Sequence, residues 1–345
     1  MPPQTLRIID ANCNRISEGL RFLEDIARFL LDDAILSQQL KATRHSLVRN
    51  LSKFGAALLS ERNSEGDVGA KIESVSQQQD LPSLITANAR RVEEALRVIE
   101  ELAKLPEISP VLHSKDFEQA RFSIYTLERM ILSKVLRQDK IARLTGLYAI
   151  IDTQTLGLKD EVDAASKAIH GGAKIIQLRD KHHGKGELLA IAQKVRDLCH
   201  KSDTLFIIND HLDIALGADA DGLHIGQADL PLMAARKELP VDKIIGCSTA
   251  TLNQALKAEA EGADYIAVGS IFPSPTKGST TAIGIEQLCQ IRQAISIPIV
   301  AIGGINSDNI SQVIAAGANS AAVISAILTQ QNIEQATRQL VAGIE

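Results

Sequence analysis

Hydrophobic positions in the first 135 residues recur at the spacing of an amphipathic helix. One stripe advances by steps of four, three, four and three residues, at Ile16, Leu20, Leu23, Ala27 and Leu30. Asp10 precedes this stripe and is a candidate N-cap. The pattern predicts an all-helical domain over residues 1–135, with the polar segment 60–79 as a loop inside it.

The helical region contains an internal repeat. Asp10-Ala11-Asn12 corresponds to Thr86-Ala87-Asn88 in the second copy. Six further positions agree, namely Arg15, Glu18, Leu20, Arg21, Glu24 and Ala27 with Arg91, Glu94, Leu96, Arg97, Glu100 and Ala103. The repeat predicts a duplicated helical hairpin with pseudo-two-fold symmetry. Its Asn, Arg and Glu side chains have two interpretations: caps and ion pairs between helices, or a ligand or partner site at the symmetry axis.

From Leu144 the pattern changes to short apolar runs that alternate with helical stretches. The eight runs are 147–151, 174–178, 205–208, 222–225, 243–246, 265–268, 298–302 and 320–324. Buried strands that alternate with helices predict a parallel sheet. A Gly-Ala pair precedes every second run, and we expect each glycine to end a helix in the left-handed conformation. These glycines are Gly172, Gly217, Gly262 and Gly317.

The predicted fold class is therefore α/β: a (β/α)₈ TIM barrel over residues 144–345, preceded by the helical domain and a linker at 136–143. A doubly wound open sheet is the alternative fold, but no apolar run is followed by GxGxxG. Since the predicted chemistry described below follows residue 176, we expect a fragment spanning 141–345 to fold and to remain active.

Composition narrows the class of protein. The chain has 345 residues, 45% of them apolar and 23% charged, with a net charge of −5. This balance does not indicate a nucleic-acid or membrane-surface partner. The four cysteines form no CxxC pair, the first residues lack an apolar signal core, and no stretch is long enough to span a bilayer. We expect a cytoplasmic protein that acts on small molecules, with self-association left open.

Polar side chains gather where the predicted strands end. Gln177, Arg179 and Lys181 lie two residues apart and would share one face of a strand. Asp210 and Asp229 follow the next two strands. Because a barrel collects these ends at one mouth, the cations would bind phosphate oxygens and the carboxylates would suit Mg²⁺. Further along, Lys277 adds a cation, and Gly303-Gly304 would let backbone amides approach a second anion.

Seven short motifs at these strand ends carry a family resemblance. They are QLRDK (177–181), ND (209–210), GQADLP (226–231), GCST (246–249), PTK (275–277), GGI (303–305) and VIS (323–325). In order and spacing the chain resembles the thiamine phosphate synthase family over about residues 144–330. The resemblance implies a transferase that joins 4-amino-2-methyl-5-pyrimidinylmethyl diphosphate to a phosphorylated hydroxyethyl thiazole, with or without a carboxyl group. The products would be thiamine phosphate and diphosphate, and Mg²⁺ would be required.

The resemblance also implies the roles of individual residues. The pyrimidine diphosphate would contact Gln177, Arg179, Lys181, Asn209, Ser248 and Lys277. The thiazole phosphate would contact Ser274, Thr276, Gly304, Ile324 and Ser325, and the metal would bind Asp210 and Asp229. The chain departs from the family in two places: Ser274 stands where Thr is frequent, and Ala250 stands where His is frequent. His211 and His224 have no partners at ligand spacing and are interpreted as structural.

Three functions follow from these residues. A synthase would use a dissociative substitution, in which the aminopyrimidine stabilises a methylene cation and no enzyme nucleophile is needed. A thiazole tautomerase on the same barrel is the alternative, although it has little use for two metal carboxylates, and Ala250 removes an acid or base. The third function is an inactive barrel that serves as a sensor or scaffold, with the helical domain as its interaction module.

Overall fold

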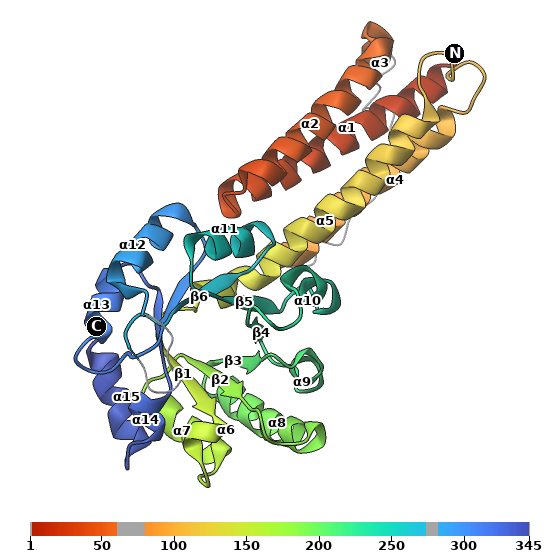
Figure 1. Cartoon of the computed structure of the whole chain (residues 1–345). Helices are drawn as coiled ribbons and strands as arrows, with labels where there is room; N and C mark the ends of the chain where they lie inside the picture. Colours follow the sequence, from red (N-terminus) through yellow and green to blue (C-terminus); the bar gives the residue numbers. More distant parts are fainter. Residues whose placement is uncertain (1, 61–79, 274–281, 345) are drawn as a thin grey trace. The chain divides into compact units, whose positions relative to one another are not determined.

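The computed structural model describes residues 2–60, 80–273 and 282–344. The chain divides into two compact units, one ending at Leu136 and the other beginning at Arg137. Figure 1 shows long helices in the first unit and a barrel of strands surrounded by helices in the second. The two units are described separately below.

The first unit is all-helical, as predicted. Its long helices are α1 (Pro3–Asp25), α2 (Ala34–Leu51), α4 (Leu81–Leu102) and, up to Leu136, α5 (Ser114–Ala142). Shorter turns lie at η1 (Ile26–Leu30), η2 (Ser52–Phe54) and α3 (Ala56–Ser60). The apolar stripes of these helices form one buried core, which contains Leu20, Leu23 and Leu96. A Cβ at Gly19 would lie 2.5 Å from Val92 Cγ2, so this glycine allows α1 and α4 to pack closely.

Two equivalent ion pairs confirm the duplication. Arg44 on α2 donates from Nε and Nη2 to Glu24 Oε2, at 3.1 and 2.9 Å. Arg121 on α5 repeats this geometry with Glu100 Oε2, at 3.2 and 3.1 Å. Both glutamates are buried, so each needs a charged partner. These glutamates and arginines hold paired helices together, which supports the ion-pair interpretation of the repeat.

The predicted N-cap at Asp10 is wrong. Helix α1 already begins at Pro3, and Asp10 lies inside it with its side chain buried. In the second copy Asp80 caps α4, because its side chain accepts from the Ser83 amide at 2.9 Å. Pro3 is the first residue of α1, a position that favours proline, and Pro82 is the second residue of α4. The predicted loop at 60–79 lies almost entirely outside the described residues.

The second unit is a closed parallel barrel with strand order β1 to β8, and β8 pairs with β1. The strands are β1 (Gly146–Asp152), β2 (Ile175–Arg179), β3 (Leu205–Asn209), β4 (Gly222–Ile225), β5 (Ile244–Thr249), β6 (Tyr265–Gly269), β7 (Ile299–Ile302) and β8 (Ser320–Val323). They coincide with the eight apolar runs to within about three residues, so the barrel prediction is confirmed.

Helices cover the outside of the barrel (Figure 1). They are α6 (Thr153–Leu156), α7 (Glu161–His170), α8 (Lys185–Lys201), α9 (Leu212–Gly217), α10 (Leu232–Glu238), α11 (Leu252–Ala260), α12 (Gly284–Ala294), α13 (Ile310–Ala315), α14 (Ser325–Leu328) and α15 (Ile333–Ala342). Alternate strand residues divide the core: Leu147 and Ala149 pack outward against helices, whereas Tyr148 and Ile150 belong to a second, inner cluster.

The glycine turns before even-numbered strands follow the prediction in three cases. Gly172, Gly262 and Gly317 have φ of +101°, +91° and +97°. Gly217 does not, since it is the last residue of α9, and Asp219 takes a φ of +52° instead. Aspartate tolerates the left-handed region better than most residues, so the turn could move by two positions.

The predicted linker at 136–143 is helical through residue 142, because α5 continues to Ala142. Arg137 and Lys140 belong to the second unit, and both bond to residues of the barrel. Arg137 Nε donates to Asp264 Oδ1 at 2.8 Å, and Lys140 Nζ donates to Asp242 O at 2.9 Å. The polar run at 138–139 is the exposed side of a helix, and such a face has the same composition as a loop. No helix in the described part of the chain is long and apolar enough to cross a membrane.

Candidate active site

Arg179 is held by a carboxylate from the neighbouring strand. The two residues face each other in the β1–β2 register, and Arg179 Nη1 donates to Asp152 Oδ1. Asp152 is buried and its other oxygen accepts from the Thr155 amide at 3.1 Å, which caps α6. The guanidinium is still partly exposed, so Asp152 fixes its position at the mouth without removing its charge from solvent.

Lys181 is positioned by the turn that follows β2. Asp180 accepts from the backbone amides of His182 and His183, at 2.8 and 2.9 Å, and its other oxygen lies 2.5 Å from His183 Nδ1. Although burial raises the pKa of Asp180, these hydrogen bonds outweigh burial and leave the pKa below its ordinary value. The ordered turn directs Lys181 Nζ to Asp210 Oδ2.

Two carboxylates from successive βα loops lie together. Asp210 follows β3 with a φ of +63°, a strained conformation that points its side chain to the mouth. Asp229, after β4, accepts from the Gly226 amide at 2.8 Å. Burial raises the pKa of Asp229, and the hydrogen bond and negative charge of Asp210 raise it further. A cation that binds an oxygen of each carboxylate would stabilise such a pair.

A chain of polar groups crosses the inside of the barrel. Gln177 Nε2 donates to Tyr148 Oη at 2.8 Å, and Tyr148 Oη lies 3.0 Å from Tyr265 Oη. His224 Nδ1 lies 3.1 Å from Tyr265 Oη, and His224 Nε2 lies 2.9 Å from Ser248 Oγ. Burial raises the pKa of both tyrosines, so their hydroxyls stay protonated. His224 is thus a buried bridging residue, in keeping with its structural interpretation.

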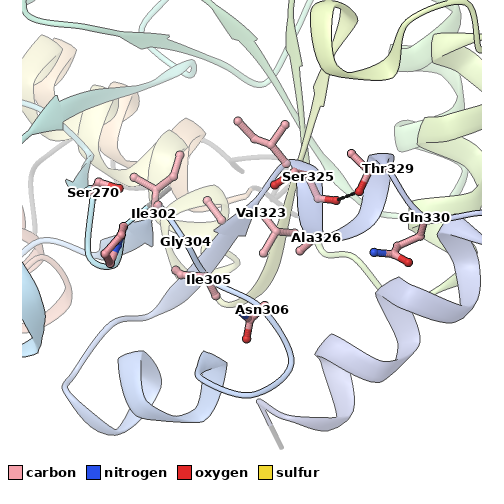
Figure 2. Close-up of a pocket in the computed structure, with 15 residues that line it drawn as sticks. Ser270, Ile302, Gly304, Ile305, Asn306, Val323, Ser325, Ala326, Thr329 and Gln330 are labelled. Atoms are coloured by element: carbon pink, nitrogen blue, oxygen red, sulfur yellow. Dashed lines mark hydrogen bonds between the residues drawn. The ribbon is translucent and has the colours of Figure 1, made fainter. Parts of the chain in front are cut away.

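A cavity of about 360 Å³ opens between the ends of β6, β7 and β8 (Figure 2). Its lining includes Gly304, Ile324 and Ser325, three of the residues assigned to the thiazole phosphate. Four polar residues that were not predicted also line it, namely Ser270, Asn306, Thr329 and Gln330. Thr329 Oγ1 donates to the carbonyl of Ser325 at 2.7 Å, which closes the first turn of α14.

The glycines after β7 are required by close packing. Gly303 and Gly304 have φ of +101° and +67°. A Cβ on Gly304 would lie 2.6 Å from the Pro273 carbonyl oxygen. Asn309 Nδ2 donates to the Gly304 carbonyl at 2.9 Å and so fixes the orientation of this peptide. Backbone groups can therefore line the cavity at a place where no side chain fits.

The structure brings most of the predicted site residues to one end of the barrel. Gln177, Arg179, Lys181, Asn209, Asp210, Asp229 and Ser248 lie at the ends of β2 to β5, and Gly304, Ile324 and Ser325 lie at the ends of β7 and β8. Asn209 is buried, and no group in the described ranges bonds to its side-chain amide. Ser274, Thr276 and Lys277 lie outside the described residues.

Comparison with known proteins identifies this arrangement. The family model described as thiamine monophosphate synthase matches residues 147–327. A thiamine-phosphate synthase from Thermosynechococcus vestitus is 40% identical over 97% of this chain and 93% of its own length. The chain belongs to the thiamine phosphate synthase family. A thiamine-phosphate synthase from Synechocystis sp. is 38% identical over 99% of this chain and 97% of its own length.

Membership of the thiamine phosphate synthase family confirms the resemblance seen in the motifs and the transferase class of the enzyme. A solved structure of thiamine phosphate pyrophosphorylase from Pyrococcus furiosus is 39% identical, with a TM-score of 0.55, and covers 59% of this chain and 96% of its own. A second family model, described as the ThiD2 family, matches residues 7–130. The helical domain thus has relatives of its own, and the cyanobacterial synthases share both parts of the chain.

Sequence reasoning missed several residues of the thiamine phosphate synthase mouth. Asp152 directly follows the first apolar run and ends β1, and the strand-end rule that found Asp210 would have found it too. Tyr148 and Tyr265 had a weaker signal, because a tyrosine within an apolar run is more often core than site. Thr329 and Gln330 follow the last strand at a distance that no motif marks, and only the fold of α14 brings them to the cavity.

Proposed function

We propose that this protein condenses 4-amino-2-methyl-5-pyrimidinylmethyl diphosphate with 4-methyl-5-(2-phosphoethyl)thiazole to give thiamine phosphate and diphosphate. The observation that carries the proposal is the charge arrangement at the mouth. Two carboxylates and two cations from β2, β3 and β4 lie on one side, and a cavity whose described lining residues are uncharged lies on the other. These are two different anion sites, which a reaction between two phosphorylated substrates requires.

Mg²⁺ fits the first side. Asp210 and Asp229 provide two carboxylates, and the pKa of Asp229 is raised first by burial and then by Asp210, whose repulsion a divalent cation would relieve. No group of three or more metal-ligating side chains occurs among the described residues, so diphosphate oxygens and water would complete the shell. When bound there, Mg²⁺ neutralises charge on the leaving diphosphate.

The protein's own residues would bind and orient the reactants. Arg179 and Lys181 contact diphosphate oxygens, with Asn209, Ser248 and Lys277 as further contacts and Gln177 on the pyrimidine. The bond between the methylene carbon and the diphosphate oxygen breaks, and both electrons leave with the diphosphate. The thiazole nitrogen then supplies the electron pair of the new carbon–nitrogen bond. No protein nucleophile takes part.

The second substrate would occupy the cavity of Figure 2. Its phosphate would accept from backbone amides near Gly304 and Ser325, since the first amides of a helix have no intrahelical partner. Ile324 would contact this substrate, and the predicted hydroxyls of Ser274 and Thr276 would add hydrogen bonds. A carboxylated thiazole is also compatible with this proposal, as are a cytoplasmic location and self-association, which stay predictions.

The test is product formation from the two purified substrates, with Mg²⁺ and with excess chelator. We expect thiamine phosphate and diphosphate in equal amounts, and their loss on chelation. Turnover of a thiazole isomer without the pyrimidine substrate would support the tautomerase instead. Binding of either substrate with no product at any metal concentration would indicate an inactive sensor, and the proposed function would be wrong.

A further inference from the structure

Asn309 holds the turn that follows β7, which forms one wall of the cavity in Figure 2. Its side-chain amide bonds to the backbone on both sides of Ile305. Nδ2 donates to the Gly304 carbonyl at 2.9 Å, and Oδ1 accepts from the Asn306 amide at 2.8 Å. Gly304, Ile305 and Asn306 line the cavity, whereas Asn309 is not one of its described lining residues. Asn309 therefore supports this wall from behind.

The orientation of the Asn309 amide follows from the backbone groups that it meets. A carbonyl only accepts and a backbone N–H only donates, so Nδ2 must face Gly304 and Oδ1 must face Asn306. The reversed amide would bring two acceptors together at one end and two donors together at the other. The side chain thus has one stable orientation, which the main chain determines.

The bond to the Gly304 carbonyl also sets the direction of the next amide. In a trans peptide the C=O and the following N–H point to opposite sides. The Gly304 oxygen points to Asn309, behind the cavity wall, so the Ile305 N–H points the other way. Ile305 is buried, and no acceptor in the described ranges bonds to its amide. A buried N–H without an acceptor is uncommon, and here it is a donor for a ligand.

A glycine beside this peptide gives the clamp its importance. Gly304 has a φ of +67°, and a glycine rotates about its backbone bonds more freely than any other residue. Without the bond from Asn309, the peptide between Gly304 and Ile305 could turn over and present its carbonyl oxygen to the cavity. Since an oxygen would repel an anion that the N–H would bind, the orientation of this one peptide matters for anion binding.

We propose that Asn309 is a positioning residue that directs the Ile305 amide to the phosphate of the second substrate. The inference rests on the proposed function, which places a phosphate in this cavity but gives no role to Asn309 or to the Ile305 amide. Asn309 itself does not contact the substrate. Its loss should therefore weaken binding of the phosphate group and leave the chemical step unchanged.

Titration of the ¹⁵N-labelled full chain with the thiazole phosphate tests the direction of the amide. The amide signals of Ile305 and Ser325 are assigned with Ile305→Val and Ser325→Thr. We expect both amide protons to move downfield as they bond to phosphate oxygens. Movement of Ser325 without Ile305 would overturn this inference alone. If neither signal moved, the place that the proposed function gives to the thiazole phosphate would be wrong, and this inference with it.

The role of Asn309 is tested with Asn309→Leu, which keeps the shape of the side chain, removes both bonds and adds no charge. We expect the KM for the thiazole phosphate to rise about tenfold, or about 1.4 kcal/mol, while kcat changes less than about twofold. At saturating thiazole phosphate, the Ser325 amide should still move downfield in this variant, whereas the Ile305 amide should not.

The matched control is Asn253→Leu, the same substitution at an exposed position of α11, and it should behave as the wild-type chain does. An unchanged KM, or an Ile305 signal that still moves in Asn309→Leu, would overturn the proposal. Loss of both amide responses at saturation would also overturn it, because Asn309 would then support the whole cavity and not one peptide.

Discussion

At the scale of single residues, the mouth depends on side chains whose charge is set by a neighbour. Asp210 has Lys181 as a partner, whereas the pKa of Asp229 is raised by burial and then by Asp210. A raised pKa means that a proton competes with a cation for Asp229. We therefore expect the apparent affinity for Mg²⁺ to fall as the pH is lowered toward the raised pKa of Asp229.

Removal of either carboxylate should abolish most of the synthase activity. Asp210→Ala and Asp229→Ala should each lower turnover by about 10²-fold or more, because the leaving diphosphate would lose its neutralising cation. Steady-state kinetics over a range of Mg²⁺ concentrations measures the effect. Asp213→Ala is the control, since Asp213 is exposed and pairs with Lys185. Near-normal turnover of Asp229→Ala at low Mg²⁺ would contradict the metal assignment.

Asp152 should act through Arg179. Asp152→Asn keeps the size of the side chain but removes the charge that holds the guanidinium. We expect the KM for the pyrimidine diphosphate to rise about tenfold, or about 1.4 kcal/mol, with little change for the thiazole phosphate. Asp160→Asn is the control, because Asp160 caps α7 through the Asp163 amide. An equal effect on both substrates would indicate a general loss of stability.

At the scale of elements, the turn after β7 determines the shape of the cavity. Gly304→Ala should weaken the thiazole phosphate first, because the new Cβ meets the Pro273 carbonyl at 2.6 Å. Gly157→Ala is a matched control: its φ is +70°, close to the +67° of Gly304, and nothing lies within 4 Å of its Cβ. Titration of each substrate separates the effects. The Gly304 assignment would be wrong if both variants weakened the thiazole phosphate equally.

In the helical domain, Glu93 should make stability depend on pH. Burial, and then the charge of Glu128, raises the pKa of Glu93 to about 7. The folded state therefore binds a proton more tightly than the unfolded state, in which the pKa is ordinary. The free energy of unfolding is greatest below the pKa that Glu93 has in the unfolded state. It falls as the pH rises from that pKa to the raised pKa of the folded state, and the full loss of stability is present above pH 7.

Calorimetry at about pH 5 and about pH 8 measures this effect on the transition of the helical domain. We expect a lower transition at the higher pH, and Glu93→Gln should reduce the difference. Glu94→Gln, on the exposed face of the same helix, should leave it intact. If the pH dependence of the transition were unchanged in Glu93→Gln, a group other than Glu93 would be its cause.

At the scale of the whole molecule, the two units should be separable, but the cut belongs before Arg137. Arg137 bonds to the buried Asp264, so a fragment 141–345 loses that contact whereas 137–345 keeps it. We expect 137–345 to be active. Fragment 141–345 should be less stable by about 1–3 kcal/mol, and no more than that, because Arg236 still pairs with Asp264 when Arg137 is absent. Urea unfolding and steady-state kinetics of both fragments measure this.

Substitutions in the full chain provide the control for truncation. Arg137→Met should destabilise the barrel by a similar amount, whereas Arg143→Met, at an exposed ion pair, should cost less than about 1 kcal/mol. A well-folded fragment 137–345 with activity reduced by more than about tenfold would show that the helical domain contributes to catalysis, and the expectation of separable units would fail.

The sequence by itself determined which elements form and which residue types stand at their ends. Period and composition are local properties, so the eight apolar runs predicted the eight strands, and the motifs at their ends predicted Asp210, Asp229 and Arg179. The repeat likewise placed Glu24 and Glu100 at equivalent positions, with ion pairs between helices as one of its two interpretations. A local signal failed at Asp10, because a polar residue inside a helix resembles a cap. The segment predicted as a linker, 136–143, is helical through Ala142.

Only the tertiary structure decided which of these groups meet. Closure of the barrel brings Tyr148 to Tyr265, 117 residues apart, and Gln177 to Tyr148, 29 residues apart. The same closure places Gly304 beside Ser325 in one cavity. The course of the polar chain and the shape of the cavity depend on strand register across the barrel. Neither is a property of any one segment, because each bond in the chain joins different strands.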